Sequence, residues 1–87
     1  MEIRIEPHTL LRAKERGTHE EEIKDVVNTG KVIQAKYGHS GKAKVYSFNQ
    51  ERLGKHYRQK NVEVYYTVEK NVAVTVTVYV FYGEWED

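Results

Sequence analysis

The fold is decided by residues 62–82, which read VEVYYTVEKNVAVTVTVYVFY. On both sides of Lys70-Asn71, apolar residues recur at every second position, which is the period of a β-strand. Valine dominates one face of each segment, and its β-branched side chain fits a pleated surface. The stretch therefore predicts a central antiparallel pair of strands. Its apolar faces would contain Val62, Val64, Tyr66 and Val68 in the first strand and Val72, Val74, Val76, Val78, Val80 and Tyr82 in the second.

The turn between these strands is predicted to contain three residues. Valines face one another when Val68 lies opposite Val74 and Val64 lies opposite Val78. A two-residue turn would shift the register by one position and place valines opposite threonines. We therefore expect an odd-length loop, with Asn71 in the left-handed conformation beside a bulge.

Two helices are predicted before this sheet. The first begins at Pro7, whose missing N–H costs nothing in a first turn, and ends near Arg16 at a glycine cap, Gly17. The second begins with a capping box formed by Thr18 and Glu21 and ends at Gly30. We expect the valine face of the sheet to meet the apolar residues of both helices, which are Leu10, Leu11, Ile23, Val26 and Val27.

Two further segments show the period of a strand, Val32–Lys36 and Lys42–Phe48. Residues 49–54 are expected to form a loop, residues 55–61 either a loop or an extension of the next strand, and residues 1–6 a short strand or an arm. The sequence therefore predicts an α+β fold in a single domain, residues 1–87. Two N-terminal helices would pack on one face of a largely antiparallel four-stranded sheet.

Composition excludes several classes of protein. The 87 residues contain no cysteine, which excludes disulfides, thiol catalysis and thiolate metal sites. No apolar run approaches the roughly 18 residues of a transmembrane helix. The first 15 residues carry six charged side chains and lack the apolar region of a signal peptide. We therefore expect a cytoplasmic protein with no membrane partner.

The net charge of +1 is unevenly distributed. Residues 31–60 contain eight Lys or Arg and one acid, whereas both flanking segments are acidic overall. The same segment holds several aromatic rings, namely Tyr37, His39, Tyr46, His56 and Tyr57. A basic segment with interspersed rings suits RNA, which offers phosphates and stackable bases. Edge strands and loops that lysine keeps soluble give the same pattern, and the sequence leaves both interpretations open.

Two clusters of side chains could act on a phosphodiester. His8, Arg12 and Arg16 recur every four residues, so they would form one stripe of the first helix. In such a stripe an imidazole can move a proton while guanidinium groups hold phosphate oxygens. The second cluster lies in residues 55–60 and combines a histidine, a tyrosine and three cations. A solvated helix face beside Glu15 and a positively charged loop are the simpler interpretations.

The sequence contains no pattern that is typical of a metal site. An HExxH motif, a paired-histidine motif and an EF-hand loop are all absent from the chain. We therefore expect no metal and no cofactor.

A set of residues in a fixed order spans nearly the whole chain. It comprises His8, Arg12, Glu15-Arg16-Gly17, Glu21-Glu22-Ile23, Gly30, Lys36–Gly38, Lys55–Val64, Thr77-Val78-Tyr79 and Tyr82-Gly83. On these residues the chain resembles a family known as a domain of unknown function, number 4258. That family looks like a distant relative of the RelE/ParE toxins, in which two helices precede an antiparallel sheet. The resemblance implies metal-independent cleavage of RNA if the chain is RelE-like, and no nuclease chemistry if it is ParE-like.

Three hypotheses follow. The first is a small RelE-like ribonuclease toxin, whose partners would be RNA and an antitoxin protein. Its catalytic residues would be His8, Arg12, His56, Lys60 and Tyr82. Its RNA-binding residues would be Arg16, Lys36, Lys42, Lys44, Lys55, Tyr57 and Arg58. The second is a non-catalytic module that binds nucleic acid or a protein across the threonine and tyrosine face of the sheet, and the third is a homodimer formed through an exposed edge strand.

Overall fold

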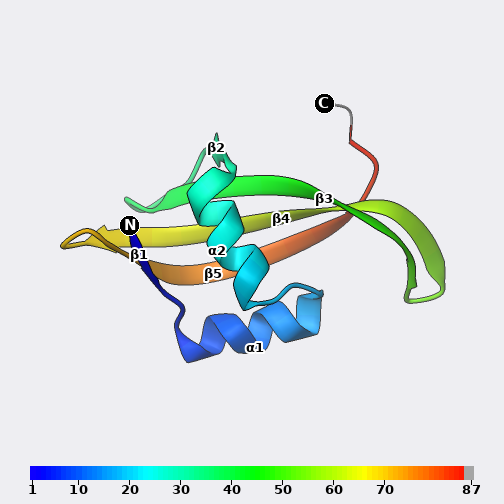
Figure 1. Cartoon of the computed structure of the whole chain (residues 1–87), viewed down its shortest axis with the longest axis horizontal. Helices are drawn as coiled ribbons and strands as arrows, with labels where there is room; N and C mark the ends of the chain where they lie inside the picture. The colour runs from blue at the N-terminus through cyan, green and yellow to red at the C-terminus, as the bar shows by residue number, and fades with distance from the viewer. Residues whose placement is uncertain (86–87) are drawn as a thin grey trace.

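The structure is a computed structural model that describes residues 1–85, and it contains two helices and five strands. Their order is β1 (Glu2–Arg4), α1 (Pro7–Arg16), α2 (Glu20–Thr29), β2 (Lys31–Ile33), β3 (Ser40–Arg52), β4 (Lys55–Glu69) and β5 (Val72–Gly83). The strands form one sheet in the order β1-β5-β4-β3-β2 (Figure 1). The predicted α+β class is confirmed. The expected four strands become five, because β1 pairs in parallel with the start of β5.

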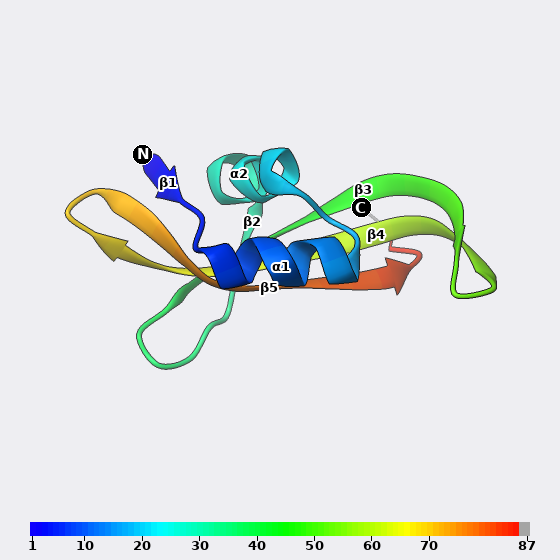
Figure 2. The same cartoon turned by 90° about the horizontal axis from the view of Figure 1, so that it is seen from below.

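The two helices pack against different parts of the sheet. α2 contacts β3 and β4, and α1 contacts β5 along its outer edge (Figure 1). Residues 34–39 form a loop on the face of the sheet that α2 leaves open (Figure 2). Within residues 1–85, no helix has the length and apolar content that crossing a membrane requires.

The helix boundaries agree with the sequence except at one cap. Gly17 ends α1 with a φ of 100° and donates its N–H to the carbonyl of Ala13, as predicted. The capping box at Thr18 is wrong, because α2 begins at Glu20 after His19. The Thr18 hydroxyl instead donates to the Glu22 carboxylate at 2.8 Å.

The core confirms the apolar face of α2 and corrects that of α1. Ile23, Val26 and Val27 are buried against the valines of β4 and β5. Leu10 and Leu11 are 39% and 58% exposed, so the expectation that they enter the core is wrong. α1 instead buries its small residues, Thr9 and Ala13, and these allow its backbone to approach β5 closely. The Thr75 hydroxyl donates to the Thr9 hydroxyl at 3.0 Å across this contact.

The hairpin between β4 and β5 has a two-residue turn, so the predicted three-residue loop is wrong. Lys70 and Asn71 have φ values of 50° and 66°, the left-handed geometry of a tight hairpin turn. Val64 nevertheless lies opposite Val78, as predicted. The extra residue is Val76, which bulges from β5 and restores the valine register beyond it. Nearer the turn, Val68 lies opposite Ala73 rather than Val74.

The hairpin between β3 and β4 is longer than expected. Residues 49–52 and 55–61 belong to the strands, so the predicted loop at residues 49–54 shrinks to a turn at Leu53-Gly54. A bulge in β3 between Ser47 and Gln50 bends the two strands. The end of this hairpin therefore curls beyond the rest of the sheet (Figure 1).

Candidate nucleic-acid interface

Three side chains meet where α1 ends, and each of them binds the backbone; Lys60 and Tyr82 are predicted site residues, whereas Arg52 is not. The last carbonyls of a helix have no partner within it and carry its partial negative charge. Here the carbonyl of Glu15 accepts a hydrogen bond from Arg52 at 2.9 Å, and that of Gly17 accepts one from Lys60 at 2.9 Å. The hydroxyl of Tyr82 donates to the carbonyl of Arg16 at 2.6 Å. We call this arrangement the α1 junction.

Lys60 is the most deeply buried cation of the α1 junction. Its side chain is 9% exposed and lies 2.7 Å from a carboxylate oxygen of Glu22, which is itself 16% exposed. Two further rings surround the Tyr82 ring, that of Phe48 at 5.1 Å and that of Tyr57 at 5.6 Å between centroids. Burial raises the pKa of Tyr82, so its hydroxyl stays protonated and donates to the helix.

A cleft of about 400 Å³ lies beside the α1 junction at the outer end of the β3–β4 hairpin. We call it the hairpin cleft, and it is lined by Lys55, His56, Tyr57, Arg58, Tyr82, Gly83 and Glu84. Lys55 lies 5.5 Å from the centre of the Tyr57 ring. Among residues 1–85, Lys55 and His56 form no side-chain hydrogen bond or ion pair. The structure thus brings four residues of the predicted basic cluster and Tyr82 into one cleft.

The predicted stripe on α1 lies apart from the lining of this cleft. His8 lies with its Nε2 2.8 Å from the carbonyl of Val76, the bulged residue of β5. Arg16 donates to the carbonyl of Val78 at 2.6 Å, and its guanidinium lies 4.8 Å from the centre of the Tyr79 ring. Arg12 pairs with Glu15 on the exposed surface at 2.9 Å. His8 and Arg16 therefore hold α1 against the outer edge of β5 through contacts with its backbone carbonyls.

The remaining predicted lysines lie toward the other end of the molecule. Lys36 belongs to the loop over the open face, where it lines a second pocket with Tyr37, Tyr65 and Tyr79. Lys42 lies on β3 opposite Val64. Lys44 is bound to Asp25 on α2 at 2.8 Å. The basic segment is consequently neutralised in part by the fold, since Asp25, Glu22 and Glu84 each take one of its cations.

Asp25 is the acceptor of a small polar network between α2 and β3. Hydrogen bonds from Lys44, Tyr46 and Thr29 lower the pKa of the Asp25 carboxyl from 3.8 to about 2. Because the folded protein binds this proton less readily than the unfolded chain, the network stabilises the fold fully above pH 3.8 and loses that contribution as the pH falls through about 2.

We therefore expect Asp25→Asn to reduce the difference in the free energy of unfolding between acidic and neutral solution. The free energy of unfolding of the native protein should exceed that of Asp25→Asn above pH 3.8, and the difference should shrink toward pH 2. Urea titrations over this range measure it. Glu20→Gln, which removes a surface carboxylate paired with Lys24, is the matched control. Parallel pH profiles for the native protein and Asp25→Asn would contradict the assignment.

Several residues of this region are not among the site residues predicted from the sequence. Arg52 and Glu22 complete the α1 junction, and Glu84 and Trp85 follow β5 beside the hairpin cleft. Trp85 is the only tryptophan in the sequence, and this is the one feature that could have drawn attention to it. No group of three or more His, Asp or Glu side chains within residues 1–85 is arranged to hold a metal ion.

Comparison with known proteins assigns the chain to a family. No curated protein and no solved structure matched the chain. Residues 5–80 match the family described as Domain of unknown function (DUF4258), a range that runs from the start of α1 through most of β5. The match includes the basic cluster of the hairpin and all of the α1 junction except Tyr82. The chain is therefore a member of the DUF4258 family.

Proposed function

We propose that this protein binds single-stranded RNA in the hairpin cleft. The observation that carries the proposal is that the cleft combines a lysine that is unpaired within residues 1–85, an exposed histidine and a half-buried tyrosine in about 400 Å³. Of the seven other cations of residues 31–60, four are held by a carboxylate or a backbone carbonyl, namely Lys44, Arg52, Arg58 and Lys60. Lys55 supplies a cation for a phosphate, and Tyr57 supplies a ring on which a base can stack.

The α1 junction supports this function by holding the cleft in shape. Tyr82 contacts Tyr57 on one side and α1 on the other, so the stacking ring is fixed before a ligand arrives. A binding group that is already ordered loses little conformational entropy on association. Lys60, Arg52 and Tyr82 are thus positioning residues in this proposal, whereas Lys55, Tyr57 and Arg58 contact RNA.

We propose as a second candidate function the cleavage of the bound RNA without a metal, as expected of a RelE-like toxin. His56 favours it, because an exposed imidazole lines the same cleft as Arg58. In that reaction the 2′-hydroxyl gives its proton to His56 and attacks the phosphorus, forming a 2′,3′-cyclic phosphate, and the departing 5′-oxygen takes a proton from water. The order of two helices before three long antiparallel strands supports the RelE/ParE-like proposal. An antitoxin partner, a homodimer and a cytoplasmic location stay predictions.

Binding is tested by fluorescence anisotropy with a labelled, unstructured RNA of about ten nucleotides, within the site size of single-strand binders. We expect Lys55→Gln to weaken binding and to lower the slope of log K against log salt by about 0.7, the loss of one phosphate contact. Lys70→Gln removes the same charge in the turn between β4 and β5 and should leave the slope unchanged. Absence of binding at low salt, or equal slopes for the two variants, would contradict the proposal.

The same RNA, labelled at its 5′ end and incubated with a chelator, separates binding from cleavage. Cleavage by the native protein and by His39→Ala, with none by His56→Ala, supports the second candidate. Intact RNA in every lane limits the function to binding.

A further inference from the structure

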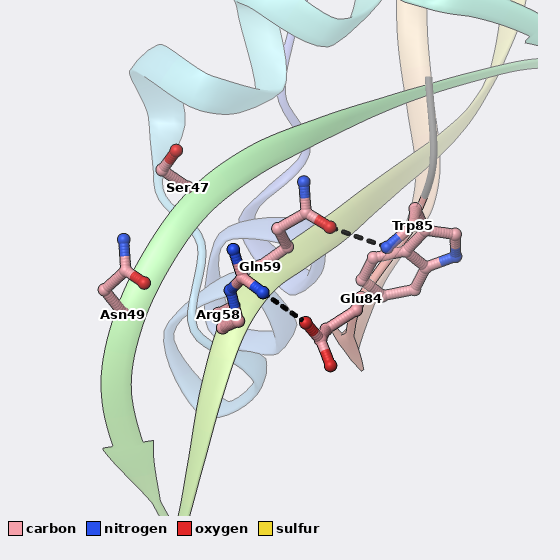
Figure 3. Close-up of a pocket in the computed structure, with 6 residues that line it drawn as sticks. All are labelled: Ser47, Asn49, Arg58, Gln59, Glu84 and Trp85. Atoms are coloured by element: carbon pink, nitrogen blue, oxygen red, sulfur yellow. Dashed lines mark hydrogen bonds and ion pairs between the residues drawn. The ribbon is translucent and has the colours of Figure 1, made fainter.

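A second, larger pocket adjoins the hairpin cleft on the side of β3. It has a volume of about 530 Å³ and is lined by Ser47, Asn49, Arg58, Gln59, Glu84 and Trp85 (Figure 3). We call it the amide pocket. In the close-up, Arg58, Gln59, Glu84 and Trp85 cluster together, and Ser47 and Asn49 lie across from them on β3. Its volume falls within the roughly 300–1,000 Å³ of ligand-binding pockets.

The polar groups of the amide pocket are arranged by the backbone. The backbone N–H of Trp85 donates to the side-chain oxygen of Gln59 at 2.6 Å, which fixes the orientation of this amide and leaves its NH₂ group available. Asn49 occupies the bulge of β3 with a φ of 49°, a conformation that asparagine tolerates. Its side-chain amide forms no hydrogen bond within residues 1–85. The pocket thus offers the NH₂ group of Gln59 near the indole ring of Trp85, and the amide of Asn49 on the opposite wall (Figure 3).

We infer that the amide pocket receives one unpaired base of the bound RNA, which rests on the proposed function of the neighbouring cleft. An indole ring stacks on the face of a base, and amides form hydrogen bonds with its edges. The hairpin cleft attracts any RNA through phosphate contacts, whereas amide groups discriminate between bases. The amide pocket is therefore the part of the surface that selects sequence.

The two sites are connected through one ion pair. Arg58 and Glu84 line both of them, and their side chains meet at 2.9 Å. These side chains are 73% and 65% exposed, so water and salt screen their attraction and the contact is readily exchanged. A strand that runs from the cleft into the pocket brings a phosphodiester to Arg58. The Glu84 carboxylate occupies that position in the free protein and therefore competes with RNA.

Trp85 makes the inference directly measurable, because it is the only tryptophan in the chain. We expect its fluorescence to be quenched by RNA of about ten nucleotides, the length of a single-strand binding site, and homopolymers of uridine, adenosine and cytidine to differ in affinity by at least about fivefold. Mononucleotides should quench it only at far higher concentrations, since they lack the phosphate contacts of the cleft. Quenching by mononucleotides at the same concentrations as the oligomers would overturn the assignment to an RNA strand.

Variants separate the pocket from the cleft. Trp85→Ala should weaken binding about tenfold, the typical contribution of one stacked base, and Trp85→Phe should restore most of it. Asn49→Gly keeps the backbone conformation and removes the amide, so it should abolish the preference among homopolymers while changing overall affinity little. Glu84→Gln should tighten binding to every homopolymer about threefold, as expected when a weak competing ion pair is removed.

The outcomes for the two proposals are distinguishable. RNA that binds by anisotropy without quenching Trp85, and with equal affinity for native protein and Trp85→Ala, would overturn the amide pocket and leave the hairpin cleft intact. RNA that fails to bind at all overturns both. Anisotropy and tryptophan fluorescence recorded on the same samples decide between these cases.

Discussion

We expect Lys60→Met to lower the free energy of unfolding by about 3 kcal/mol, because it strands a buried carboxylate. Glu22 is 16% exposed, and Lys60 is its nearest cationic partner at 2.7 Å. The other contacts of this carboxylate are the Thr18 hydroxyl at 2.8 Å and the His19 ring at 3.8 Å. The substitution also removes the hydrogen bond to the carbonyl of Gly17 at the end of α1. Methionine keeps the length and apolar stem of lysine, so loss of packing contributes little. Urea denaturation followed by circular dichroism measures the change.

Two comparisons isolate the cause. Glu22→Met added to Lys60→Met removes the stranded charge, so the double variant should recover most of the lost stability. Lys44→Met removes a lysine from a carboxylate pair that is more than one-third exposed on both sides and should cost at most about 1 kcal/mol. Equal losses for Lys60→Met and Lys44→Met would contradict a buried pair. Loss of activity in a Lys60 variant would report on the fold as well as on chemistry.

Gly17→Ala should destabilise the protein by about 3 kcal/mol, the sum of a strained backbone and a steric clash. Gly17 has a φ of 100°, which side chains rarely adopt. A Cβ atom there would also meet the Tyr82 hydroxyl, the group that holds the end of α1. Thermal and urea denaturation of the single variant give the total cost.

The two contributions can be measured separately. Gly38 has a φ of 73° and open space around it, so Gly38→Ala carries the backbone strain alone and should cost about 1 kcal/mol. Tyr82→Phe removes the hydroxyl that the new Cβ would meet, so Gly17→Ala should cost less in a Tyr82→Phe background than in the native one. Equal losses of unfolding free energy for Gly17→Ala and Gly38→Ala would mean that the new Cβ atom at position 17 does not clash with Tyr82.

The sequence predicts those parts of the fold that depend on local chemistry. Pro7 and Gly17 mark the two ends of α1 because their backbone preferences act within one turn. The apolar stripe of α2 is equally local and is buried as expected. The predicted core contact of α1 is wrong because leucine is more hydrophobic than threonine and alanine, so the sequence favours Leu10 and Leu11 over Thr9 and Ala13. Which face of α1 is buried depends on how closely it approaches β5, and that contact joins segments 66 residues apart in the sequence.

The β4–β5 hairpin shows a limit of a different kind. Alternating valines require one extra residue between Val64 and Val78, and the sequence correctly predicts that pairing. The alternation of valines does not determine where the extra residue lies, because either the turn or a strand can contain it. The structure places it at Val76, where the carbonyl of the bulge lies beside His8 of α1. The bulge thus coincides with a tertiary contact, which the alternation of valines does not reveal.

The sequence indicates which types of residue line the candidate site, but it does not indicate how they are arranged in space. Basic and aromatic residues of the hairpin do form a cleft, but Lys60 and Tyr82 point to the end of α1. A lysine that holds a phosphate and one that holds a helix carbonyl have the same sequence signature, since both complement negative charge. The distinction depends on α1 ending directly above β4 and β5, a relation between segments more than 40 residues apart.

The contact between α1 and β5 has a consequence for colloidal behaviour. Beyond its short pairing with β1, the outer edge of β5 is a valine-rich strand, the type of segment on which further chains assemble into fibrils. His8 and Arg16 occupy the outward carbonyls of Val76 and Val78, so an incoming strand finds no free acceptor there. Partial unfolding that releases α1 would expose this edge. Aggregation of this protein should therefore start with the detachment of a single helix.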